Sequence, residues 1–194
     1  MKSILKANLD RKISLSPAEF ELFFKSFELF SYRKKEHLLQ AGNRCEYYFF
    51  VVKGLVRNYH IDQKGKEHIT AFAIENWWVT DLDSFFKKEQ AELHIQALEE
   101  TTVLAITIDK LEAAFISIPL LNTFFRIQMQ NMLMAIQRRH HFYMKEEGKK
   151  RYEFLVKRLP EFVQRIPQYM LASYLDLTPE YLSELRKIPF NSGS

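Results

Sequence analysis

The alternation of hydrophobic and polar residues between positions 32 and 108 predicts a series of short β-strands. Three stretches each contain two strand-like runs around a turn, with turns at residues 53–54, 63–65 and 99–100. These stretches read "YYFFVVKGLVRNYHI", "HIDQKGKEHITAFAI" and "HIQALEETTVLAITI". Short strands with turns at such spacing are typical of an antiparallel roll or barrel. We therefore expect an antiparallel β-roll in the first part of the chain.

A short amphipathic helix is predicted before the roll, within residues 16–30. Ser16 is a good N-cap, and Pro17 suits the first helical position. Glu19 completes the spacing of a capping box, in which each of the two side chains bonds to the other residue's backbone. The start of this helix is therefore well specified.

After residue 109 the hydrophobic spacing becomes helical. The segment "IDKLEAAFISI" predicts one short helix, and Pro119 suits the first turn of a longer helix that reaches about residue 144. Along this long helix, hydrophobic residues recur at heptad spacing, broken by Arg139; they are Phe125, Met129, Met132, Ile136 and Tyr143. The pattern fits a helix packed on its own domain or a coiled-coil-like dimer seam, and the length of the helix favours the dimer.

Two further features of this region concern packing and flexibility. Phe124 and Ile127 lie off the heptad seam, so we expect them to pack on the roll. Gly148 interrupts the charged stretch "KEEGKK", which is the best candidate for a hinge before the last helices.

The segment "RIPQYMLASYLDLTPEYLSELRKI" predicts two short helices around a three-residue joint. Pro167 suits the start of the first helix, and Ala172 lies where two helices can cross closely. Asp176 tolerates the left-handed backbone of a turn. Thr178 is a good N-cap, and Pro179 fits the first position of the second helix. Leucines 175, 177, 182 and 185 are expected to face inward.

This spacing is typical of a helix-turn-helix unit, whose second helix enters the DNA major groove. The residues expected to contact bases or phosphates are Thr178, Glu180, Tyr181, Ser183, Glu184, Arg186 and Lys187. Lys and Arg also outnumber Glu between residues 138 and 165, which would favour phosphate. The alternatives are a structural helical hairpin and a solvated basic helix surface.

Composition narrows the class of protein. Hydrophobic residues make up 47% of the 194 residues, which suffices for a packed core. Cys45 is the single cysteine, so neither an internal disulfide nor a cysteine-based metal or iron–sulfur site is possible. No signal peptide and no apolar run of membrane-spanning length is present. We expect a cytoplasmic protein that does not contact a membrane.

The residues that could support enzymatic chemistry do not form a known pattern. The six histidines include no pair one residue apart, although His60 and His68 would face each other across the second hairpin. No nucleophile elbow, P-loop or dinucleotide fingerprint occurs. We therefore predict no catalytic residues, no metal and no cofactor. A metal enzyme built on the roll remains an alternative.

Taken together, the order of these parts resembles the CRP/FNR-type transcription regulators, in particular their short members from Bacteroidetes-type bacteria. The residues that carry the resemblance are "AGNRCEYYFFVVKGLVRNYHIDQKGKEHI", "NWWVTDLDSFF", "IQALEETTVLAI", the long helix and "RIPQYMLASYLDLTPEYLSELRK". The resemblance implies a homodimer with a cyclic-nucleotide-binding-like roll, a dimerising helix and a DNA-reading terminus. It also implies an imperfect palindrome as the DNA target, RNA polymerase as a further partner and a small-molecule effector.

The sequence departs from this family in its phosphate cassette. The family uses a Gly-Glu pair and then an Arg followed by Ser or Thr. Here Thr80-Asp81 and Ala91-Glu92 occupy those places, so the Arg that pairs with phosphate is absent and Glu92 would repel phosphate. We expect no cyclic AMP binding. The residues expected to line a pocket are Trp78, Thr80, Asp81, Ala91 and Glu92, and Trp77 is a further candidate.

A second departure lies after Ile188, where "PFNSGS" is too short for the β-hairpin wing of many relatives. The predicted fold class is α+β: an N-terminal antiparallel β-roll of the cyclic-nucleotide-binding type, a long dimerisation helix and a C-terminal helix-turn-helix domain. The predicted domains are residues 1–117, 118–147 and 148–194. The predicted function is DNA-binding transcription regulation. The alternative is a small-molecule-binding β-roll module whose helical tail is structural.

Overall fold

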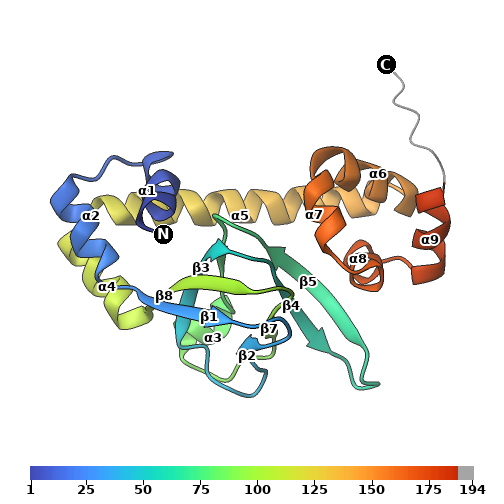
Figure 1. Cartoon of the computed structure of the whole chain (residues 1–194), viewed down its shortest axis with the longest axis horizontal. Helices are drawn as coiled ribbons and strands as arrows, with labels where there is room; N and C mark the ends of the chain where they lie inside the picture. The colour runs from blue at the N-terminus through green and yellow to red at the C-terminus, as the bar shows by residue number, and fades with distance from the viewer. Residues whose placement is uncertain (188–194) are drawn as a thin grey trace.

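The computed structural model describes residues 1–187 (Figure 1). A β-roll occupies the centre, the long helix α5 runs along it, and the last four helices lie at one end of α5. The helices are α1 (Lys2–Asp10), α2 (Pro17–Phe24), α3 (Leu82–Lys87), α4 (Ile108–Ser117), α5 (Leu120–Lys145), α6 (Gly148–Arg158), α7 (Pro160–Arg165), α8 (Gln168–Leu175) and α9 (Pro179–Lys187). The strands are β1 (Glu28–Tyr32), β2 (His37–Leu39), β3 (Tyr47–Lys53), β4 (Val56–Ile61), β5 (Glu67–Ala73), β6 (Trp78–Val79), β7 (His94–Ala97) and β8 (Thr101–Thr107).

The roll consists of two four-stranded sheets within the described residues. Their strand orders are β1-β8-β3-β6 and β2-β7-β4-β5, and every pairing is antiparallel. A mixed α and β fold with an antiparallel roll and a long helix is therefore confirmed. Large hydrophobic residues fill the space between the sheets, as expected for a sandwich of two inner faces.

The prediction of three hairpins is right for one and wrong for two. Strands β4 and β5 pair directly around the turn at residues 62–66. Strands β3 and β4 belong to different sheets, and so do β7 and β8. The turns between them pass from one sheet to the other, and they lie against each other. Gly54 has a φ of +109°, and a Cβ there would lie 2.8 Å from the carbonyl oxygen of Glu100. Only glycine fits this crossing.

The capping box before the roll is confirmed. The Ser16 hydroxyl accepts a hydrogen bond from the Glu19 backbone N–H, and the Glu19 carboxylate accepts one from the Ser16 N–H at 2.8 Å. Helix α2 nevertheless ends at Phe24, short of the predicted range, because residues 28–32 pair with β8 as a strand. A further helix that we did not predict, α1, buries Leu5 and Leu9 completely or nearly so.

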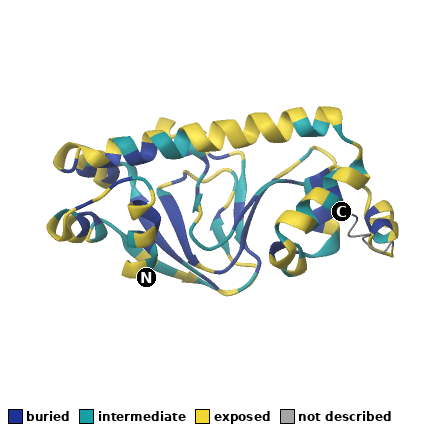
Figure 2. Cartoon of the chain, turned by 90° about the horizontal axis from the view of Figure 1, so that it is seen from above, coloured by how far each residue is buried: buried dark blue, intermediate teal, exposed yellow. Residues whose placement is uncertain are grey.

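The C-terminal helices share a hydrophobic cluster with the outer face of the β2-β7-β4-β5 sheet. Phe72 of β5 makes edge-on ring contacts with Phe162 of α7 and Tyr174 of α8, at centroid distances of 5.5 and 5.2 Å. Helix α8 lies against β5 more extensively than any other C-terminal helix lies against the roll. The last four helices are therefore docked on the roll, while the central turns of α5 stay exposed (Figure 2).

Candidate functional site: a terminal two-helix unit and a pocket in the roll

The joint between α8 and α9 is built as the sequence predicts. Asp176 adopts the left-handed conformation with φ 57° and ψ 50°, and the Leu177 N–H donates to the Ala172 carbonyl at 2.9 Å. The Thr178 hydroxyl accepts a hydrogen bond from the Tyr181 N–H at 3.1 Å and so caps α9. Pro167 lies at the N-cap of α8, whereas we had predicted it as the first helical residue. Pro119 likewise is the N-cap of α5.

The inner face of this unit is buried. Ala172 and Leu182 have no exposed surface, and Leu175 and Leu185 are 2% and 5% exposed. Leu177 packs against the same cluster and is half-buried. The absence of a large side chain at Ala172 allows the helices to approach closely. These leucines fix the position of α9.

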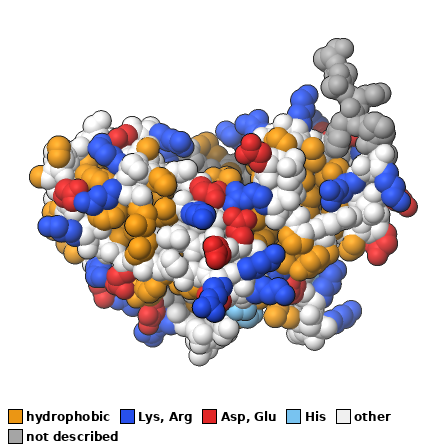
Figure 3. All heavy atoms as spheres, viewed as in Figure 1, with side chains coloured by type: hydrophobic (Ala, Val, Ile, Leu, Met, Phe, Trp, Pro, Cys, Tyr) orange, Lys and Arg blue, Asp and Glu red, His pale blue; other side chains and the backbone are white. Residues whose placement is uncertain are grey.

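The outer face of α9 is free within the described part of the chain. Of the predicted contact residues only Ser183 is half-buried, and the exposed ones are Thr178, Glu180, Tyr181, Glu184, Arg186 and Lys187. Lys and Arg side chains gather around the end of the molecule formed by α6–α9, with fewer acidic side chains among them (Figure 3). The predicted contact residues are therefore exposed except for Ser183, and their role in binding stays a prediction.

Gly148 does not form the break between α5 and α6. The extended residues are Glu146 and Glu147, with ψ angles of 141° and 159°, and Gly148 is the first residue of α6. A Cβ at Gly148 would overlap the Leu177 side chain and lie 3.4 Å from the Tyr181 ring. The glycine leaves space for the end of the Leu177 side chain. The helix break lies at residues 146–147, within the charged stretch predicted as a hinge.

The predicted heptad seam is divided among three environments. Phe125 is 6% exposed and packs in the roll with Met129, so neither is free for a partner. The Tyr143 hydroxyl donates to the Tyr174 carbonyl at 2.6 Å, and burial raises the pKa of Tyr143 to about 12. Met132 and Ile136 remain exposed, at 37% and 51%. Phe124 is buried in the roll as predicted.

Most of the predicted pocket residues already have a role in the fold. Four of them are used by the fold: the Trp78 indole N–H donates to Asn8, the Thr80 hydroxyl donates to the Tyr47 carbonyl, Asp81 caps α3, and Ala91 is buried. Glu92 is exposed, and so is Trp77, at 47%. Trp78, Thr80, Asp81 and Ala91 therefore serve packing and capping, and a ligand pocket around the predicted residues stays a prediction.

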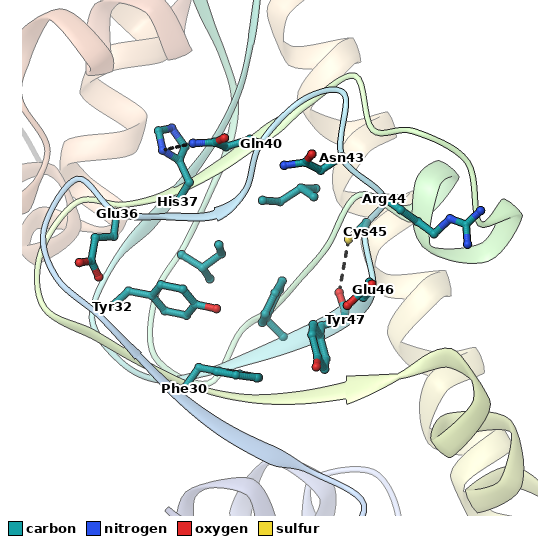
Figure 4. Close-up of a pocket in the computed structure, with 13 residues that line it drawn as sticks. Phe30, Tyr32, Glu36, His37, Gln40, Asn43, Arg44, Cys45, Glu46 and Tyr47 are labelled. Atoms are coloured by element: carbon teal, nitrogen blue, oxygen red, sulfur yellow. Dashed lines mark hydrogen bonds between the residues drawn. The ribbon is translucent and has the colours of Figure 1, made fainter.

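A different pocket, of about 570 Å³, lies between β1, β2 and the start of β3 (Figure 4). Its floor consists of Phe30, Tyr32, Tyr47 and Phe49, and its other wall includes leucines 38 and 39. The sequence did not reveal it because β1 and β3 come together only through β8, which lies between them in the sheet and about 50 residues or more later in the chain. The alternation in "FSY" and in "YYF" shows that the rings of each strand face one side of that strand. It does not show that the rings of the two strands share a cavity.

A chain of polar contacts leads from the pocket to α8. His37, at the pocket wall, is 2.9 Å from the Tyr59 hydroxyl, and the Arg57 guanidinium lies 4.0 Å from the centre of the Tyr59 ring. Arg57 donates two hydrogen bonds to the Glu67 carboxylate. The Ser173 hydroxyl of α8 then donates to the Glu67 carbonyl and accepts from the β5 backbone at Ile69. These contacts form a continuous path from the pocket wall to α8.

A second contact holds the terminal helices on the roll. Arg165 of α7 donates to Glu75 at 2.9 and 3.0 Å and to Glu99 at 2.7 Å. The two carboxylates hold the pKa of Arg165 above its usual range. Glu75 and Glu99 precede β6 and β8, each in a loop where the chain passes from one sheet to the other. The guanidinium therefore clamps α7 onto the end of the roll.

Groups suited to metal chemistry do not converge. No set of three or more His, Cys, Asp or Glu side chains with metal-binding geometry occurs among residues 1–187. His60 and His68 face each other across the β4–β5 hairpin as predicted, with rings stacked at 5.0 Å, and His68 bonds to Asp62. Burial raises the pKa of the Cys45 thiol. In the described part of the chain, no helix is long and apolar enough to cross a membrane.

Comparisons with known proteins show which folds this architecture resembles. Residues 29–117 match the family described as "Cyclic nucleotide-binding domain". The structure of FixK2 from Bradyrhizobium japonicum is similar at 21% identity, covering 87% of this chain and 89% of that one, with a TM-score of 0.69. The regulator CLP from Xanthomonas campestris, described as c-di-GMP responsive, is similar at 14% identity over 89% and 90%, with a TM-score of 0.69.

The catabolite activator protein of Thermus thermophilus is similar at 19% identity over 93% of this chain and 85% of that one, with a TM-score of 0.59. No curated protein matches the sequence. Residues 29–117 are therefore similar to cyclic nucleotide-binding domains, and the chain has the fold of the three solved regulators named above. The structural neighbours are regulators and not enzymes.

Proposed function

We propose that the chain is a homodimeric, cytoplasmic DNA-binding transcription regulator of the CRP/FNR type. Its roll would respond to a ligand other than cyclic AMP. The observation that carries the proposal is the exposed outer face of α9, held at the end of the molecule by the buried leucines of a helix-turn-helix geometry. In this assignment residues 1–117 sense, 118–147 dimerise and 148–194 bind DNA. The residues after Ile188, where a wing would begin, lie outside the described part of the chain.

The chemistry of α9 suits base edges in the major groove. In this proposal Thr178, Tyr181 and Ser183 contact phosphates or base edges, and Glu180 and Glu184 accept hydrogen bonds from cytosine amino groups. Arg186 and other basic residues before and after α8 would pair with phosphates. Because the carboxylates of Glu180 and Glu184 repel phosphate, the affinity for DNA should depend strongly on the basic residues and therefore on the salt concentration.

The central part of α5 supports a dimer with a second copy of this chain. Met132, Leu133, Met134 and Ile136 are all exposed, at 37% to 57%, within five consecutive positions. At about 100° per residue Met132, Leu133 and Ile136 lie within about 100° of one another, whereas Met134 points to the opposite side. Exposed hydrophobic residues on that shared face favour a partner helix. A twofold axis through α5 would present two copies of α9 to successive major grooves, so the target should be an imperfect palindrome.

The residues at the phosphate cassette, Thr80-Asp81 and Ala91-Glu92, argue against binding of cyclic AMP. Ala91 stands where the family places its phosphate-binding Arg, and its backbone N–H donates to the Asn43 carbonyl at 2.8 Å. The Asp81 carboxylate accepts from the Ser84 N–H and is buried as the cap of α3. Neither residue offers a partner to a cyclic phosphate. A ligand signal from the roll would pass along α5 and the helix break at residues 146–147 to the contacts with DNA and RNA polymerase.

The test is binding-site selection from a random duplex library, at two salt concentrations. The proteins are the wild type, the double variant Tyr181→Ala/Glu184→Ala, and Glu112→Ala as an exposed carboxylate control on α4. The wild type and the control should enrich a palindrome that the double variant loses. If the folded wild type enriches no sequence at either salt concentration, the terminal helices are structural, and the alternative of a ligand-binding roll replaces this proposal.

A further inference from the structure

The pocket between β1, β2 and β3 has an aromatic floor that the fold leaves partly uncovered. Phe30 and Tyr47 make an edge-on contact at 5.3 Å, and Tyr47 and Phe49 lie 5.9 Å apart. Phe30, Tyr32 and Tyr47 pack on the core but are only half-buried, although they face a cavity between two sheets. Aromatic surface of this kind gains free energy when a flat apolar molecule covers it.

We propose that this pocket binds a planar aromatic small molecule that carries no negative charge and has one hydrogen-bonding group. Its volume, about 570 Å³, lies within the range of small-molecule sites. As the effector of a regulator, such a ligand rests on the function proposed above. The binding itself does not require DNA and is tested separately.

The hydrogen-bonding group is required by Tyr32. Its hydroxyl makes no hydrogen bond to any described residue, and it points into the pocket (Figure 4). The Tyr47 hydroxyl, in contrast, donates to the Glu28 carboxylate at 3.2 Å and is occupied. Burial raises the pKa of Tyr32, so the group is a neutral hydroxyl at physiological pH. It can donate to a carbonyl or ring nitrogen of a ligand.

The charges around the opening exclude an anion. The carboxylates of Glu36 and Glu46 belong to the lining, whereas the guanidinium of Arg44 extends away from the cavity toward α3 (Figure 4). Burial and the neighbouring His94 lower the pKa of His37, so His37 adds no positive charge at neutral pH. A phosphate or carboxylate would lose its hydration without gaining a cationic partner. The preferred ligand class therefore differs from the cyclic nucleotides.

The position of His37 indicates how ligand binding could affect the terminal helices. His37 belongs both to the pocket lining and to the contact chain through Tyr59, Arg57 and Glu67 to α8. A ligand that shifts His37 changes the hydrogen bond to Tyr59. A change in this hydrogen bond would then shift the position of α8 on β5. The orientation of α9 would shift with α8.

The experiment is a fluorescence titration of the full chain with the uncharged naphthalene ketone 6-propionyl-2-dimethylaminonaphthalene, in the absence of DNA. Saturable binding with a blue-shifted emission is expected for the wild type. Phe30→Ala should weaken it by about tenfold through the loss of ring contact. Tyr32→Phe, which keeps the ring, should weaken it by about fivefold through the loss of one hydrogen bond. Circular dichroism and thermal unfolding establish that each variant is folded.

The matched control is Leu29→Ala, next to Phe30 on the same strand but 50% exposed and outside the pocket. It should bind the probe as the wild type does. The anionic probe 1-anilinonaphthalene-8-sulfonate should bind more weakly than the ketone. The proposal is overturned if no saturable binding occurs, or if Phe30→Ala and Tyr32→Phe bind as tightly as the wild type. It is also overturned if only Ile136→Glu, on α5, removes the signal. None of these outcomes bears on DNA selection.

Discussion

Arg165→Ala should loosen the terminal helices from the roll without unfolding either part. The clamp consists of Arg165 with Glu75 and Glu99, whose side chains are 29%, 34% and 39% exposed. Solvent screens ion pairs of this exposure, so the two pairs together contribute about 1 to 1.5 kcal/mol. This corresponds to a change of about five- to tenfold in the ratio of docked to undocked molecules. The hydrophobic contacts of Phe72 remain and keep most molecules docked.

Hydrogen exchange at the Ile69 amide reports this equilibrium directly. The Ile69 N–H donates to the Ser173 hydroxyl of α8, so it is released when α8 leaves the sheet. Its exchange in Arg165→Ala should accelerate about five- to tenfold, in line with the ion-pair contribution. The control Lys88→Ala removes an exposed ion pair with Asp109 at the far side of the roll and should leave the rate unchanged. An unchanged Ile69 rate in Arg165→Ala would show that the clamp does not hold the docked state.

Three further outcomes are expected. Gly148→Ala places a methyl group against the end of the Leu177 side chain. Because this half-buried side chain can rotate away and Ala is favoured over Gly in a helix by up to about 1 kcal/mol, the free energy of unfolding in urea should change by less than about 1 kcal/mol; a larger loss would show that Leu177 is held rigidly. The pKa values of His37 and His94 are lowered, mainly by burial, from 6.5. Because the unfolded chain then binds more protons, the unfolding free energy should fall as the pH drops from 7.5 through the unfolded pKa to 5, and replacing both residues with Gln should flatten this dependence. Ile136→Glu should turn the expected dimer into a monomer in sedimentation; a dimer that persists would place the interface elsewhere.

Local signals in the sequence predicted the features that depend on neighbouring residues. The capping box of Ser16 and Glu19, the left-handed Asp176 and the Thr178 cap are each decided within four residues. The β4–β5 hairpin is likewise local, because its turn connects strands that pair with each other. The inward leucines of the terminal unit follow from helical periodicity alone.

Features that depend on distant contacts could not be predicted in the same way. The Gly54 turn has the composition of a hairpin, but its strands enter different sheets because β3 pairs with β8. The heptad pattern identified one face of α5 without showing that the roll covers Phe125. The space beside Gly148 is limited by Leu177, 29 positions later. The pocket forms between strands that are brought together by β8. In each case the deciding neighbour is far away in sequence.

The most direct test of the central claim is the spacing of the two half-sites in the selected DNA. Affinity is measured by fluorescence anisotropy for the selected palindrome and for a version with five extra base pairs between its halves. Such an insertion, about half a helical turn, moves one half-site to the opposite face of the duplex. A dimer that presents two copies of α9 should bind the altered duplex at least tenfold more weakly. Equal affinity for both duplexes would contradict the account, because it would show that the chain does not read DNA as a twofold dimer.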